Sequence, residues 1–133
     1  MQVKLITDYA LRILIYLGLK NSVANSKEIA SQLDIPQKNV LSIGRKLKKT
    51  NYVSIISGPY GGYIIKRAPE NILIYDVFSI FADIKISCLF REKKAHQNIA
   101  DSIAIQLYSE LQEMFEEKLK SYTLADLISE HQG

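Results

Sequence analysis

The chain has 133 residues, of which 47% are hydrophobic and 23% are charged, and its formal net charge at pH 7 is +3. This size and balance predict one folded domain, and they exclude a disordered chain and two independent enzyme-sized units. The apolar runs are far shorter than the ~20 residues that cross a bilayer, and the first residues lack a signal-peptide pattern, so we expect a cytoplasmic protein without a membrane partner.

Side chains suited to catalysis or metal binding are scarce. Cys88 is the only cysteine, and His96 and His131 are the only histidines. A single thiol excludes an intrachain disulfide and cannot supply a thiolate-rich zinc site or the four-cysteine ligation of an iron-sulfur cluster. Because the chain also lacks a catalytic constellation of Ser, His and Asp and a phosphate-binding loop, we expect no enzymatic activity, no metal site and no cofactor.

The charge is unevenly distributed along the chain. Residues 1–70 contain 11 Lys and Arg against 4 Asp and Glu, a net charge of +7, whereas residues 71–133 contain 6 against 10, a net charge of −4. A basic half next to an acidic half indicates a surface for a polyanion at one end and a different interaction, often self-association, at the other. Ordinary solvated surface charge gives the same totals. Only the position of the charges within motifs can distinguish it from a surface that binds a polyanion.

The first part of the chain predicts helices separated by a sharp break. Apolar residues at steps of three and four predict a helix over residues 8–20, with Asp8 at its start. Ser26 is expected to cap a short second helix that ends near Asp34, and Pro36 to begin a third helix. The second and third helices, with their short connection, are typical of a helix-turn-helix.

The pattern changes to β-branched and aromatic residues beyond position 50. Residues 52–57 and 63–67 predict two strands, and the Gly/Pro-rich segment 58–62 connects them as a β-hairpin. A hairpin that follows a helix-turn-helix is a wing. Pro69 ends the second strand, and residues 75–84 predict a short amphipathic helix.

The last part of the chain predicts a long helix over residues 98–122, followed by a short one over residues 124–128 that Thr123 caps. A single helix cannot bury its own apolar stripe, so we expect a homodimer in which two copies of the long helix pack together. The predicted dimer-interface residues are Ile103, Leu107, Leu111 and Met114, with Ala100 before them and Phe115 and Leu119 extending the stripe.

The predicted fold class is therefore mostly α, a winged helix-turn-helix with a small β-hairpin wing and a long C-terminal dimerisation helix. We expect a DNA-binding domain over residues 1–84, a linker over residues 85–97, and the dimerisation helix with the C-terminal helix over residues 98–133.

Polar and basic side chains of the third helix and the wing are the candidates for contact with double-stranded DNA. Amide and hydroxyl groups suit base edges and cations suit phosphates. A solvated lysine face or a plain turn explains either element alone, but the two together favour DNA binding. The base-edge candidates are Gln37, Asn39 and Ser42; the phosphate candidates are Lys38, Arg45, Lys46, Lys48 and Lys49; those of the wing are Tyr60, Lys66 and Arg67.

Four motifs are spread over nearly the whole length of the chain. They are Asp8-Tyr9-Ala10-Leu11-Arg12, Lys27-Glu28-Ile29-Ala30, Gly58-Pro59-Tyr60-Gly61-Gly62-Tyr63 and Leu124-Ala125-Asp126-Leu127. In these motifs the chain resembles the Rrf-two family of bacterial winged-helix transcriptional regulators. The resemblance implies a homodimer that binds an inverted-repeat operator and usually represses transcription.

The chain departs from the family pattern at three places. Leu41 replaces a common glutamate of the recognition helix, and Ser57 replaces a common arginine of the wing. These changes leave open the alternative of a degenerate member that regulates through a protein partner. Cluster-bearing relatives have three cysteines before the long helix, where this chain has only Cys88, which is either a redox sensor or a buried small residue. Asp8 matches a cluster ligand of some relatives, but we interpret it as helix N-terminal charge.

Overall fold

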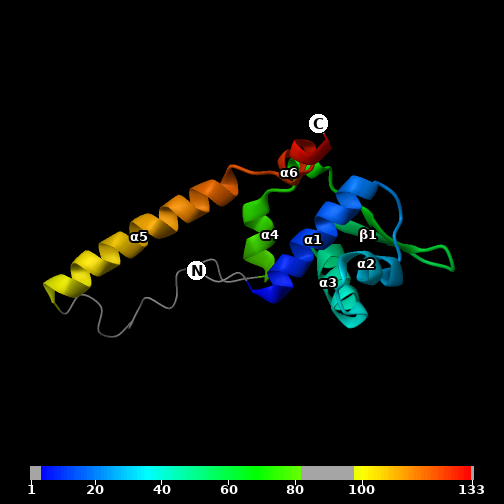
Figure 1. The fold of residues 1–133 in the computed structure, drawn as a ribbon, viewed down its shortest axis with the longest axis horizontal. Helices are drawn as coiled ribbons and strands as arrows, with labels where there is room; N and C mark the ends of the chain where they lie inside the picture. The colour runs from blue at the N-terminus through cyan, green and yellow to red at the C-terminus, as the bar shows by residue number, and fades with distance from the viewer. Residues whose placement is uncertain (1–3, 82–97, 133) are drawn as a thin grey trace.

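The computed structural model describes residues 4–81 and 98–132, and these residues form a mostly helical fold with one hairpin (Figure 1). This arrangement confirms the predicted order of elements. In chain order the elements are α1 (Leu5–Lys20), α2 (Ser26–Leu33), α3 (Gln37–Lys49), β1 (Val53–Ile56), β2 (Gly62–Ile65), the 3-10 helix η1 (Pro69–Asn71), α4 (Ile74–Phe81), α5 (Ile99–Lys120) and α6 (Leu124–Gln132).

Side-chain caps determine where several helices begin. Asn25, not Ser26, caps α2, because its Oδ1 accepts a hydrogen bond from the Glu28 backbone N–H at 2.8 Å. Asn98 caps α5 in the same way. Thr123 caps α6 as predicted, with its Oγ1 accepting from the Asp126 N–H at 3.1 Å, and α6 continues well beyond the predicted short helix.

The core is built on α1, whose buried residues Ala10, Ile13, Leu14 and Leu17 occupy one side of the helix. Isoleucine, leucine and valine side chains of α2 and α3 pack against this side. The final helix α6 completes the same core, because Leu124 and Ile128 are buried within it. A Cβ at Gly18 of α1 would lie 2.5 Å from Ile128 Cδ1, so α1 and α6 are in close contact.

The α6 helix is attached to the segment before α4 by backbone hydrogen bonds. The Leu124 N–H donates to the Ile72 carbonyl at 2.8 Å, and the Ile74 N–H donates to the Tyr122 carbonyl at 3.0 Å. The sequence pattern predicts one C-terminal unit made of the long helix and α6, whereas in the structure α6 packs into the core of the N-terminal part. We call this part, α1 to α4 with α6, the head.

The wing is a two-stranded antiparallel sheet in which Val53 pairs with Ile65 and Ile56 with Gly62. The first strand begins one residue later than predicted, and the second strand ends two residues earlier than predicted. Tyr63 of β2 also forms an isolated bridge to Ala24 of the α1–α2 loop, with N···O distances of 2.8 and 2.9 Å. The strand β2 is therefore fastened both to β1 and to the loop that precedes the helix-turn-helix.

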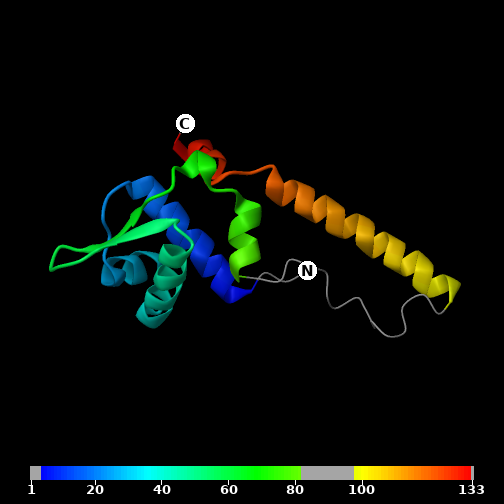
Figure 2. The ribbon, with the colours of Figure 1, turned by 180° about the vertical axis from the view of Figure 1, so that it is seen from behind.

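The long helix α5 projects from the head as an arm, on the side away from the wing (Figures 1 and 2). Its C-terminal part contacts α4, where the rings of Phe78 and Phe115 meet edge to face with centroids 6.5 Å apart. Leu119 is partly buried against the core of the head, and Phe115 is half-buried beside Phe78, so these two do not extend the exposed stripe as the sequence suggested. In a helix of 3.6 residues per turn, a step of four residues advances by slightly more than one full turn. Successive steps of four therefore shift the side chains around the helix, and Phe115 and Leu119 lie on a different side from Ile103. None of the described helices is long and apolar enough to cross a membrane.

A close contact between the wing and the recognition helix generates the first prediction. A Cβ at Gly44 of α3 would lie 2.6 Å from Tyr63 Cζ, well inside van der Waals contact. We expect Gly44→Ala to lower the free energy of unfolding by about 2 kcal/mol, because the Tyr63 ring or α3 must shift. Helix propensity alone would raise it by about 1 kcal/mol, so the two effects have opposite signs. Urea denaturation measures the difference.

The matched control is Ser42→Ala, an exposed position of the same helix, which is expected to change stability by less than about 0.5 kcal/mol. A Gly44→Ala variant more stable than the parent protein would contradict the prediction.

Candidate nucleic-acid interface

The recognition helix α3 has one side in the core and the other in solvent. Val40, Ile43, Gly44 and Leu47 are buried. The cationic side chains predicted to contact phosphates are all exposed, and these are Lys38, Arg45, Lys46, Lys48 and Lys49. The helix therefore presents a continuous basic surface that the packing of its apolar side holds outward.

The base-edge candidates lie near the first turns of α3. Ser42 and Gln37 are exposed, while Asn39 is half-buried. The Gln37 Nε2 donates a hydrogen bond to Ser26 Oγ at 3.0 Å, which links the start of α3 to the start of α2. Gln37 thus has a positioning role within the helix-turn-helix that its sequence position alone did not reveal.

Lys46 lies at the edge of this basic surface, where α3 faces α4. Its Nζ is 5.1 Å from the centroid of the Phe81 ring in α4, a distance typical of a cation–π contact. Its charge therefore stands beside α4, on the flank of the basic surface.

The two cations at the base of the wing have different surroundings. Lys66 is exposed, and its Nζ is 3.5 Å from Asn51 Oδ1. Arg67 is half-buried, with its guanidinium 4.3 Å from the centroid of the Tyr52 ring and its Nη2 donating to the Thr50 carbonyl at 3.3 Å. Burial raises the pKa of the Tyr52 hydroxyl. Arg67 holds the wing against the end of α3.

The wing itself, residues 53–65, contains no charged side chain, so the cations predicted for the wing lie at its base. Tyr60 stands at the tip with 94% of its surface exposed, and Ile55 and Ile56 of β1 are also exposed. The tip is tight, since a Cβ at Gly61 would overlap the Ile56 carbonyl oxygen. The wing therefore offers close backbone approach and apolar side chains, while the positive charge resides on α3 and at the wing base.

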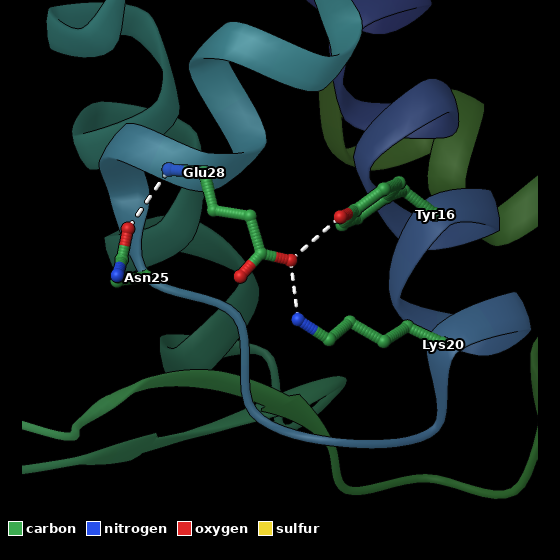
Figure 3. A network of polar contacts seen from close by, with 4 residues as sticks. All are labelled: Tyr16, Lys20, Asn25 and Glu28. Atoms are coloured by element: carbon green, nitrogen blue, oxygen red, sulfur yellow. Dashed lines mark hydrogen bonds and ion pairs between the residues drawn. The ribbon is translucent and has the colours of Figure 1, made fainter.

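A polar network fixes α2 relative to α1 (Figure 3). Glu28 Oε2 accepts hydrogen bonds from the Tyr16 hydroxyl at 2.6 Å and from Lys20 Nζ, both on α1. These bonds, Lys20 first and Tyr16 second, lower the pKa of the Glu28 carboxyl. The same hydrogen bond to Glu28 raises the pKa of the Tyr16 hydroxyl. Because α2 supports the turn that leads into α3, this carboxylate helps to set the angle of the recognition helix.

The lowered pKa of Glu28 makes stability depend on pH. A carboxyl whose pKa is lower in the folded state stabilises the fold above its unfolded value of 4.5, and this contribution is lost as the pH falls through the folded value. We expect Glu28→Gln to lower the free energy of unfolding by about 1 kcal/mol at neutral pH, with the difference shrinking below pH 4.5. Urea denaturation at a series of pH values measures this.

Glu70→Gln is the control, because Glu70 is exposed on η1, outside this network. A difference between Glu28→Gln and the parent protein that stays constant with pH would contradict the role of the carboxylate.

The apolar stripe of α5 is exposed in the single chain. Ile103, Leu107, Leu111 and Met114, the predicted dimer-interface residues, expose between 43% and 65% of their surfaces. None of them belongs to the core of the head or packs against it.

The candidate redox sensor Cys88 lies outside the described residues, as do His96 and the predicted linker over residues 85–97. Asp8 Oδ2 accepts a hydrogen bond from Arg12 Nε at 2.9 Å, which satisfies it within α1. Within residues 4–81 and 98–132 no three His, Cys, Asp or Glu side chains converge in the manner of a metal site.

Comparison with known proteins identifies relatives of the whole chain. The family model Rrf2, described as an iron-dependent transcriptional regulator, matches residues 4–130. The HTH-type transcriptional regulator NsrR of Bacillus licheniformis is 32% identical over 126 residues, which cover 92% of this chain and 88% of that protein. NsrR of Oceanobacillus iheyensis is 34% identical over 135 residues, which cover 96% of this chain and 90% of that protein.

Solved structures have the same fold. CymR, the global cysteine regulator of B. subtilis, matches with a TM-score of 0.80 at 23% identity over 97% of both chains. IscR of T. potens matches with a TM-score of 0.76 at 21% identity over 98% of this chain and 88% of that one. The winged-helix fold class is thereby confirmed, and the relatives are transcriptional regulators, not enzymes. The chain belongs to the Rrf2 family and is a DNA-binding transcriptional regulator.

Proposed function

We propose that the protein acts in the cytoplasm as a homodimeric repressor that binds an inverted-repeat operator. The observation that carries this proposal is the basic outer side of α3, where Lys38, Arg45, Lys48 and Lys49 are exposed while the opposite side is held in the core. A helix placed in this way enters the major groove, with its cations on phosphates and its polar side chains near base edges. Repression follows when the bound dimer occupies promoter DNA.

The dimer is supported by the exposed stripe on α5. A monomer that left these four apolar side chains in water would carry an unsatisfied hydrophobic surface along its arm. Pairing with the same stripe of a second copy buries it under two-fold symmetry. Two heads related in this way read half-sites one helical turn, about 34 Å, or a multiple apart, and such half-sites form an inverted repeat.

Removal of one cation tests the role of α3. We expect Arg45→Ala to weaken binding to a duplex selected from randomised DNA and to reduce the magnitude of the salt slope by about 0.9 for each phosphate that is no longer neutralised. Fluorescence anisotropy across a salt titration measures both. Lys118→Ala on the arm is the matched control, because it removes the same charge far from α3 and should leave the slope unchanged. Binding that does not depend on salt would overturn the proposal.

A charge in the stripe tests the dimer. We expect Leu107→Glu to turn the dimer into a monomer at micromolar concentration, because a carboxylate would be buried against its own copy. Sedimentation equilibrium measures the mass. Ser109→Glu places the same charge on another exposed side of α5 and should leave the dimer intact. Since Leu107 lies outside the core of the head, the variant head is expected to stay folded.

We further propose that regulation works without a resident iron-sulfur cluster, although the family model is described as iron-dependent. The donor set does not fit such a cluster, because the sequence supplies one thiol per chain where four cysteines are usual. Asp8, which the resemblance suggested as a ligand, is bonded to Arg12.

A protein partner is the second candidate target. The uncharged wing favours it, because the exposed Ile55, Ile56 and Tyr60 resemble the apolar anchors of protein interfaces more than a phosphate-binding surface. Selection from randomised DNA separates the two: enrichment of an inverted repeat supports the repressor, and weak, sequence-independent binding supports the partner.

A further inference from the structure

One apolar side chain of the recognition helix lies outside the core. Val40, Ile43 and Leu47 of α3 are at most 1% exposed, whereas Leu41 is 38% exposed. Leu41 belongs neither to the core cluster nor to the partly buried residues that pack against it. Its exposure therefore does not come from an incomplete core contact.

The neighbours of Leu41 on the helix are groups suited to DNA. Lys38 is three residues before it and Arg45 four residues after it, so all three share one side of α3. Both cations are exposed. Phosphate contacts by these two would bring Leu41 into the major groove between them, in the first half of the helix, where residues reach base edges.

A leucine side chain recognises only an apolar group, and the base edges of the major groove offer one of that kind, the C5-methyl of thymine. We propose that Leu41 contacts a thymine methyl in each half-site and so favours an A·T pair at that position. This inference rests on the proposed DNA-binding function. The inference gives Leu41 a role in sequence specificity, whereas comparison with the family pattern shows only that a glutamate is missing there.

Removal of that methyl alone is the direct test. Duplexes are first selected from randomised DNA with the parent protein, and each thymine of a half-site is then replaced in turn by deoxyuridine, which keeps the base pair and lacks the methyl. Burial of one methyl group corresponds to about fourfold in affinity. We expect one thymine per half-site whose replacement weakens the parent protein about fourfold and has little effect on Leu41→Ala.

Two variants complete the comparison. Leu41→Met keeps an apolar contact and is expected to keep the sensitivity to deoxyuridine, and so is Ser109→Ala, an exposed position of α5 outside the DNA-binding surface. Thermal unfolding followed by circular dichroism confirms that Leu41→Ala is folded, as expected for a side chain outside the core.

Failure of the two proposals gives different results. If an inverted repeat is enriched with a steep salt slope but no deoxyuridine distinguishes Leu41→Ala from the parent protein, the Leu41 inference is overturned and the repressor stands. If no duplex is enriched, the proposed function fails and the Leu41 inference fails with it.

Discussion

The contact between Tyr63 and Gly44 determines how the wing and the recognition helix are placed relative to one another. The tyrosine ring occupies the space where a side chain of α3 would be, and the backbone of the same residue pairs with Ala24 in the loop before α2. One residue of β2 thus joins the wing, α3 and the loop before α2. The Glu28 network and the Arg67 stack act around this junction, the first by fixing α2 to α1 and the second by fixing the wing base to the end of α3.

The two ends of the molecule differ in the sign of their surface charge. Exposed cations gather on α3 and at the wing base, whereas α5 exposes Glu110, Glu113 and Glu117. A polyanion is attracted to the first surface and repelled by the second. The acidic residues of the arm therefore disfavour phosphate contacts along α5, which agrees with the proposed pairing of its apolar stripe with a second copy of the chain.

The elements that follow from local pattern could be predicted, whereas contacts between distant segments could not. The apolar stripe of α1 and the glycine-rich turn of the wing are each formed by residues close together in the sequence, and each pattern predicted its element correctly. Asn25 and Ser26 are adjacent and equally suited to capping, so the sequence could not choose between them. The guanidinium of Arg67 turns inward over the Tyr52 ring, and the whole hairpin separates these two residues in the sequence. Charge alone therefore identified the basic surface of the site but not which cations serve the fold.

The position of α6 has a consequence for the order in which the protein is made. Leu124 and Ile128 fill the core around α1, so the head lacks part of its interior until these residues have left the ribosome. Synthesis runs from the N-terminus, and α5 is therefore complete before the head closes. In the proposed dimer the head therefore depends on the last residues of the chain for its interior, whereas the apolar stripe of the arm does not.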